Sequence, residues 1–538
     1  MATLKNRYFS TNKHNNAQRV FYAGFDGGLN LSVPSESLPK NELKDAVNVE
    51  FSPLTGSMKV RGGLVWSGRF DDEVDDVVPV QGRRGFLARR KDTKELYYFR
   101  WNNIWPVTGE LSGDGKLSIA HWMEKTTTLG GEEQEVNCWL IASGGRLQKF
   151  SDTPTPHIED ILTGPMRPVS EIKNTLGETT GFVCISTNCH QVFSRDGRVV
   201  VVGDNDTICF SALGDCENWT NNLNDESSAQ WVQVGYKDGM KINAVMPLSK
   251  DLIIFKSPDG EPDKGTIYRL TGEYPDWAVV EVAHNTGTFS QQSVCAVGND
   301  IIYATVAGIA TLSTVTNYGE VKTSWPDRKV SNALTPELDA TARVFDVPVK
   351  QQVWISPSED SKKIWVFDYV RGIWTTFEFP ERIVYAAGVD NQLFVFIGQD
   401  LYEVNDDYTQ DELRDTGKQI ITARMKLGTL LTGMQILVKG AFASFELKPE
   451  CRAYLILGNW RMPFAFGGAV DYIYGDTSDS SSNYYQYASE DTDPLAPQGG
   501  TLTSRRRCIV RDWEITPEIV IEGGGCSVST IGIEIAEV

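Results

Sequence analysis

The chain has 538 residues, 41% of them apolar and 23% charged, so it can bury the cores of two or more domains and wholesale disorder is not expected. Its formal charge of -20, from 51 basic and 71 acidic residues, excludes a protein that wraps nucleic acid tightly by neutralising phosphates. The polar N-terminus lacks the apolar core of a signal peptide, and no apolar run reaches the roughly 18 residues of a membrane span, so neither is expected.

Residues 1–69 are predicted to form an extended polar arm that leads into a glycine-rich hairpin. Within the arm, residues 39–47 (PKNELKDAV) carry Leu43, Ala46 and Val47 at helical spacing between charged side chains. This spacing predicts a short helix in which the apolar side chains pack and the charged ones face water.

Residues 70–405 consist of short β-branched and aromatic runs separated by Gly, Asn, Asp and Pro, a pattern typical of many antiparallel strands. Four of the runs repeat one hairpin, in which a strand aromatic is followed about eight or nine residues later by a tryptophan. The repeat predicts an irregular β-propeller of about five to seven blades. We predict that the tryptophans of these hairpins anchor the blades rather than form a sugar-stacking platform. They are Trp105, Trp219, Trp277 and Trp374.

Residues 406–419 (DDYTQDELRDTGKQ) read as a linker, and residues 420–538 as a C-terminal β-rich domain that resembles a β-sandwich. Loops as long as residues 475–500 are usually functional, disordered or in contact with a neighbouring subunit. We therefore take Tyr484, Tyr485 and Tyr487 as candidate contacts to another subunit or a partner. Arg505, Arg506 and Arg507 form a basic cluster that suits DNA phosphates, an acidic partner surface, or a strand with salt bridges at an interface.

Catalytic and metal-binding motifs are not evident in the sequence. The acidic run at residues 71–76 (DDEVDD) lacks the spacing of a calcium loop and is predicted to be a solvated loop. Asp196 and Gly197 predict a hairpin turn rather than the Asp-box of sialidases. The nine cysteines contain no C-x-x-C and the five histidines no metal-binding spacing, so we expect no cofactor and no metal.

Three stretches resemble a known family. The first runs from residues 27–30 (GGLN) through 45–49 (DAVNV) to the hairpin at 55–63, the second is residues 210–219 (FSALGDCENW), and the third is residues 251–272 with 297–313. Together they resemble the nozzle (tail tubular protein B) and packaged-DNA stabilisation proteins of short-tailed bacteriophages. The resemblance spans roughly residues 24–400.

The resemblance implies a structural virion protein rather than an enzyme. Such a protein is assembled in the host cytoplasm and forms a ring, often of six subunits, below the portal and adaptor of the tail. Such a ring lines and gates the DNA channel, contacts tail fibre or tip proteins, and lets DNA pass without sequence-specific binding. An alternative is a glycan-binding or glycan-cleaving propeller at a tail tip. A cellular scaffold propeller is disfavoured because WD and kelch signatures are absent.

Overall fold

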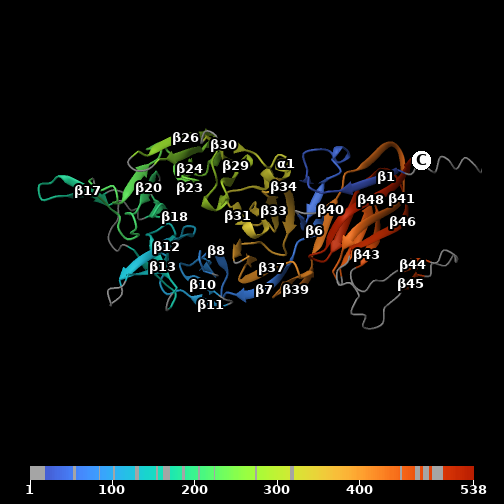
Figure 1. The fold of residues 1–538 in the computed structure, drawn as a ribbon, viewed down its shortest axis with the longest axis horizontal. Coiled ribbons are helices and arrows are strands. Elements are labelled where there is room, and N and C mark those ends of the chain that lie inside the picture. The colour runs from blue at the N-terminus through green and yellow to red at the C-terminus, as the bar shows by residue number, and fades with distance from the viewer. Residues whose placement is uncertain are drawn as a thin grey trace, which may run out of the picture.

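The computed structural model describes residues 18–537 with gaps at 53–55, 84, 101–102, 128–132, 153–154, 162–169, 184–187, 204–205, 223, 273–275, 316–319, 390, 449–450, 467–472, 476–483 and 487–500. Almost all described elements are strands. Figure 1 shows two bodies side by side, a large propeller and a smaller C-terminal domain. The all-β prediction is therefore confirmed.

The propeller has seven groups of four antiparallel strands joined side by side among the described residues, six as separate sheets and one as the end of a larger sheet. The first three blades are β8–β11 (Val74–Pro79, Gly85–Arg90, Leu96–Arg100, Asn103–Pro106), β12–β15 (Ser118–Thr127, Glu133–Ala142, Gln148–Ser151, His157–Asp160) and β18, β19, β20 and β22 (Gln191–Arg195, Arg198–Val202, Thr207–Phe210, Gln230–Gln233). The fourth to sixth are β23–β26 (Lys241–Leu248, Asp251–Ser257, Thr266–Thr271, Ala278–His284), β27–β30 (Val294–Val297, Asp300–Thr305, Gly308–Val315, Glu320–Ser324) and β31–β34 (Arg343–Val347, Gln352–Ser356, Lys363–Asp368, Ile373–Glu378).

The seventh blade closes the ring with a strand from the other end of the propeller. Its first three strands are β35 (Tyr385–Val389), β36 (Gln392–Ile397) and β37 (Asp400–Asn405), and the fourth is β7 (Gly63–Arg69), which precedes the first blade in sequence. The seventh and first blades also share a buried core that includes Phe394, Phe396 and Phe86. Residues 63–69 thus belong to the propeller, not to the arm, because their backbone completes an otherwise open sheet edge.

Burial patterns separate the two bodies. Strands β24 and β32, the second strands of the fourth and sixth blades, are buried at every residue because each blade is covered on both faces by its neighbours. In the C-terminal domain, strands such as β42 (Arg452–Leu457) alternate between exposed or partly exposed and buried residues. Alternation of this kind is expected of a sheet with one face on a core and one toward solvent.

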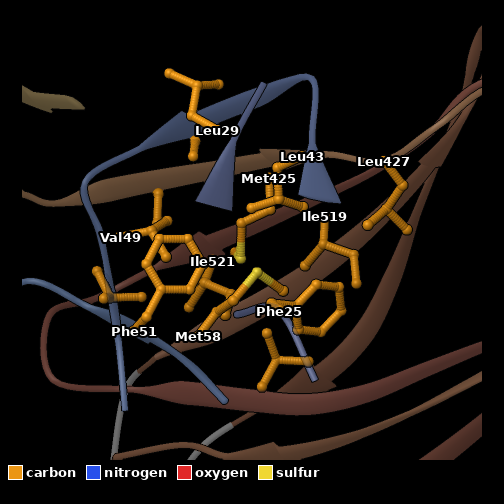
Figure 2. Close-up of a cluster of buried hydrophobic side chains, with 14 of the residues drawn as sticks. Phe25, Leu29, Leu43, Val49, Phe51, Met58, Met425, Leu427, Ile519 and Ile521 are labelled. Carbon is orange, nitrogen blue, oxygen red and sulfur yellow. The ribbon is translucent and has the colours of Figure 1, made fainter. Parts of the chain in front are cut away.

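The C-terminal domain is a sandwich of two sheets, as predicted. One contains β41 (Leu430–Glu446), β46 (Thr501–Ile515) and β48 (Ser527–Glu537), joined at its edges by β1 (Gln18–Ala23), β5 (Val49–Phe51) and β6 (Met58–Val60). The facing strands are β40 (Thr422–Lys426), β47 (Pro517–Glu522), β42 and β43 (Trp460–Phe466). The two sheets share one core, in which Phe25, Phe51 and Met58 of the N-terminal segment pack close to Ile519 and Ile521 (Figure 2).

The predicted helix at residues 39–47 is wrong. The chain there forms β3 (Glu42–Leu43), which pairs in parallel with β2 (Gly28–Leu29), and β4 (Asp45–Val47), which pairs with β40. Leu43, Ala46 and Val47 are buried as expected, but Glu42 is buried too, and its carboxylate pairs with Lys329 at 2.8 Å. Strand partners distant in sequence outweigh the short helical pattern.

Residues 406–419, predicted as a linker, instead contribute to a hairpin of β38 (Gln410–Leu413) and β39 (Gly417–Ile420). This hairpin carries the buried Asp411, which holds the two bodies together as described next. A segment that supplies a buried charge to a core has a fixed conformation, so it is not a free connector.

Candidate functional site at the junction of the two bodies

Strand β4 joins the propeller to the sandwich through continuous backbone pairing. On one side it pairs in parallel with β34, the last strand of the sixth blade, and on the other it pairs antiparallel with β40. The result is one nine-stranded sheet that runs from the blade into the sandwich. The Thr375 hydroxyl shares its one proton between the carbonyl oxygens of Ala46 at 3.0 Å and Val49 at 2.9 Å, and this contact holds β4 against the blade.

Arg61 lies at the centre of the junction and is only 2% exposed. Its guanidinium donates two hydrogen bonds to the carboxylate of Asp411, at 2.9 and 2.7 Å. The three remaining N–H groups donate to the Asn48 side chain at 3.0 Å, the Gly62 carbonyl at 3.1 Å and the Glu378 carbonyl at 3.1 Å. All five guanidinium donors therefore have acceptors, which is what a buried arginine requires.

Asn48 extends this network to both bodies. Its side-chain oxygen accepts from the backbone N–H of Glu378 at 2.8 Å, and its amide nitrogen donates to the Thr422 carbonyl at 2.9 Å. Its backbone has φ of 58°, a left-handed conformation that asparagine tolerates better than most residues. One side chain thus connects the sixth blade to the first strand of the sandwich's second sheet.

A second ion cluster lies around Asp406, just after the seventh blade. Its carboxylate accepts from Lys59 at 2.6 Å and from Lys350 at 3.0 Å, and Lys350 also donates to Glu50 at 3.2 Å. Burial alone would raise the pKa of Asp406, but the Lys350 and Lys59 ammonium groups outweigh it and lower that pKa. The Lys448 ammonium donates to the Asp406 carbonyl oxygen, which brings in the sandwich.

The glycines of the motif at residues 27–30 and 61–63 are explained by close packing. A Cβ at Gly28, whose φ is +66°, would lie 2.8 Å from Cβ of Ile373 in the sixth blade. A Cβ at Gly63 would lie 2.3 Å from the carbonyl oxygen of Gln410. At both positions the backbone approaches a neighbouring segment too closely for any side chain.

The tryptophans predicted to be blade anchors differ in environment. Trp374 and Trp219 are 1–2% exposed, and their indole N–H groups donate to the carbonyls of Pro326 and Cys216. Trp277 is partly buried, with its ring centroid 4.5 Å from that of Phe210. Trp105 is 50% exposed on β11, the outermost strand of the first blade, so the prediction that it anchors a blade is wrong.

The structure places the backbone of the other candidate contacts. Tyr484 and Tyr485 lie in β45 (Tyr484–Gln486), which pairs with β44 (Ile473–Gly475), whereas Tyr487 lies outside the described residues. Arg505, Arg506 and Arg507 lie within β46, opposite Phe442, Ala441 and Gly440 of β41. Their role as subunit or partner contacts stays a prediction.

The acidic run at residues 71–76 is not a solvated loop. Asp72, Glu73 and Asp75 pair with Arg90, Lys91 and Arg89 of the first blade at 2.9, 2.6 and 2.8 Å, and Asp76 is buried. Asp196 and Gly197, with φ of 48° and 70°, form the predicted turn between β18 and β19. Across the described ranges, no group of three or more His, Cys, Asp or Glu is arranged to hold a metal ion.

Sequence comparison adds no relatives, because no protein-family model and no curated protein matches the chain. Among the described residues, no helix is long and apolar enough to cross a membrane.

Comparison with solved structures finds β-propellers at low similarity. The WD40 propeller of Doa1 is 13% identical with a TM-score of 0.36, over 64% of this chain and 96% of that one. BamB from Moraxella catarrhalis is 10% identical with a TM-score of 0.34, over 64% and 96%. A gluconolactonase from Xanthomonas campestris is 8% identical with a TM-score of 0.29, over 68% and 98%. With TM-scores this low, the fold assignment rests on the strand pairing described above.

Proposed function

We propose that the protein is a structural, non-enzymatic component of a bacteriophage tail, a nozzle or hub subunit that forms a ring with its own copies. In this role the ring lies below the portal and adaptor, contacts fibre or tip proteins, and surrounds the channel through which the genome is retained and ejected. The protein would be assembled in the host cytoplasm and function in the virion.

The observation that carries the proposal is the position of the segment that resembles the tail family. Its strands β4, β5 and β6 lie in the sheets of the sandwich, and β7 completes the last blade. The arginine of the motif, Arg61, is the buried centre of the junction. The family-like residues thus hold two bodies as one unit, and a rigid unit suits a part that must transmit force rather than open around a substrate.

The net charge of -20 is compatible with this role. An acidic wall repels the phosphates of passing DNA, so DNA would move along it without adhering. A closed ring also requires each subunit to present two different surfaces to its neighbours. Residues 505–507 of β46 (Arg505, Arg506 and Arg507) are our candidate for part of one of them, with an acidic surface of the next subunit as the partner.

Ring formation can be tested by measuring the mass of the purified protein at high concentration, alone and with its adaptor. We expect a closed oligomer whose formation weakens when all three arginines are changed to glutamine. Changing Lys241, Lys250 and Lys264 on the fourth blade to glutamine removes the same charge and should leave assembly intact. A strict monomer under both conditions would refute the proposal, and glycan-array binding would favour the glycan alternative.

A further inference from the structure

Strand β26, the outermost strand of the fourth blade, has one edge that pairs with no strand in the described parts of the chain. Its other edge pairs regularly with β25 from Ala278 to Glu281, and a bulge at Val282 interrupts the pairing. In an antiparallel pair, alternate residues direct both backbone groups away from the partner strand. Two of these four residues therefore direct a backbone N–H and C=O outward from the blade.

The side chains along residues 278–281 are exposed on both faces of the strand. Val279 and Val280, which point to opposite faces, are 38% and 49% exposed. Arg269 of β25, opposite this stretch, is paired with Asp251 at 2.6 Å, so its charge is compensated. The edge thus combines unpaired backbone groups with apolar side chains, which makes it a template for a strand of another chain.

The outer strands of three other blades are protected from such pairing. β11 of the first blade ends at Pro106, which has no N–H to donate. β15 of the second blade has only four residues, and two of them are the acids Glu159 and Asp160. The outer edge of β34 in the sixth blade is covered by β4. Prolines, short charged strands and covering strands are means by which proteins block edge pairing, so the unprotected edge of β26 indicates a binding surface for a β-strand.

The N-terminal segment of the chain supplies strands to open sheet edges. β1 adds to β48, β4 adds to β34, and β7 completes the seventh blade. Residues 1–17 precede β1 and lie outside the described residues. An extended segment of this length spans about 55 Å. Because Figure 1 shows β1 in the sandwich and β26 on the far part of the propeller, residues 1–17 fit the edge of a neighbouring copy better than that of their own.

Charge also favours residues 1–17 as the strand that pairs with β26. The segment carries no acidic residue and three basic ones, Lys5, Arg7 and Lys13. The exposed acids Asp276 and Glu281 lie at the two ends of the exposed stretch of β26. Glu281 also contacts the exposed His284, which carries a charge only when it is protonated. A basic strand placed along this edge therefore meets two carboxylates.

We propose that residues 278–281 of β26 bind residues 1–17 of a neighbouring copy of the chain as an added β-strand. The contact rests on the ring proposed above and identifies two surfaces through which its subunits meet. The segment and the edge are different surfaces of one subunit, as a cyclic ring requires. In this mode of binding the backbone groups supply the hydrogen bonds, and the side chains on each face supply the specificity.

Zero-length cross-linking tests which segment occupies the edge. Unlabelled and nitrogen-15-labelled full-length protein are mixed, assembled at high concentration and treated with a carbodiimide, which joins lysine amines to carboxylates in contact. We expect mass spectrometry to find Lys5 or Lys13 joined to Asp276 or Glu281 in peptide pairs of mixed isotope. Backbone amide exchange at residues 278–281 should also slow on assembly, because the edge N–H groups become hydrogen-bonded.

Val280→Arg should lower the yield of the mixed cross-links about tenfold, because an arginine at the edge repels the basic segment and disfavours strand addition. Val306→Arg is the matched control, since Val306 is 47% exposed in a turn of the fifth blade and the same charge is introduced there. It should leave the yield close to that of the unaltered protein. Circular dichroism checks that both variants are folded.

A closed oligomer without mixed-isotope cross-links, or with unchanged amide exchange at residues 278–281, would overturn this contact and leave the proposed ring intact. Cross-links found only within one isotope would mean that the segment pairs with its own blade, which also overturns the contact. Equal yields in Val280→Arg and Val306→Arg would have the same consequence. A strict monomer would count against the ring and the contact together.

Discussion

Asp346, on the inner strand of the sixth blade, is a partly buried carboxyl group whose ionised form destabilises the fold. One of its oxygens is buried without a hydrogen-bond partner in the described structure, and burial raises its pKa from 3.8 to about 6. The folded protein therefore binds this proton more tightly than the unfolded chain. The contribution of Asp346 to the free energy of unfolding is highest below about pH 4 and decreases as the pH rises to about 6.

Asp346→Asn removes this titration. We expect the variant to be more stable than the unaltered protein at pH 8 by about 1 to 2 kcal/mol, less than the full shift implies because the side chain is partly solvated, and to gain little at pH 4. Urea unfolding at the two pH values measures the difference. Asp196→Asn, in an exposed turn, is the control, and an equal gain at pH 8 in that variant would contradict the assignment.

Arg61 and Asp411 present the opposite case, because each charge compensates the other in a site that is almost fully buried. Arg61→Met or Asp411→Leu alone leaves one charge unpaired in the core and should destabilise the protein by about 3–5 kcal/mol. The double variant should be closer to the unaltered protein than either single one. In contrast, Arg461→Gln removes an exposed pair with Glu522 and should change the free energy of unfolding by at most about 1 kcal/mol.

At the scale of elements, two cysteines offer a link between the sheets of the sandwich. Cys451 precedes β42 and Cys526 precedes β48, and both are buried and free. A hydrogen bond from the Cys451 thiol, aided by the Lys448 backbone N–H at 3.3 Å, lowers the pKa of Cys526. Because the lowered pKa favours the Cys526 thiolate, we expect Cys526 to be the attacking thiol once an oxidant reaches this buried pair.

Treatment with diamide should oxidise this pair to a disulfide, the two thiol hydrogens passing to the reagent. Closing a loop of this length should stabilise the sandwich by about 4 kcal/mol if the bond forms without strain. Peptide mapping without reductant identifies the bond, and the melting temperature reports its effect. Cys526→Ser should abolish both changes, and a stabilisation that persists in that variant would have another source.

The sequence predicted correctly the hairpins, whose two strands are close together in the chain. In three of the four hairpin repeats, for example from Tyr97 to Trp105, the aromatic and the tryptophan lie on or beside the third and fourth strands of one blade. The fourth repeat does not follow this pattern, because Trp219 lies in a loop before β21 (Thr220–Asn222). Strand β21 pairs with β17 (Thr179–Val183) of a separate hairpin rather than with a strand of the third blade. A strand preference does not specify which sheet accepts the strand.

The junction could not be predicted either, because its contacts join residues that are far apart in the sequence. Arg61 and Asp411 are 350 residues apart, and nothing near either residue indicates that they meet in the core. The motif at residues 61–63 could be recognised by resemblance, but its physical role became clear only from its packing against Gln410. The predicted helix failed likewise, since β4 pairs with strands far along the chain on both sides.

At the scale of the whole molecule, the nine-stranded sheet and the Asn48 contacts make the propeller and the sandwich one mechanical unit. Strand β4 is paired with a strand of each body, so unfolding of either body breaks backbone hydrogen bonds to β4. We therefore expect the unaltered protein to unfold in a single calorimetric transition.

Asn48→Gly keeps the left-handed backbone without strain but deletes the side chain that joins Thr422, Glu378 and Arg61. This variant should unfold in two separable steps, with the sandwich first. Asn391→Gly, at an exposed turn with φ of 65°, makes the same substitution in the same conformation and should keep the single transition. Two transitions in the unaltered protein, or identical traces for the two variants, would show that the bodies are coupled by something other than this junction.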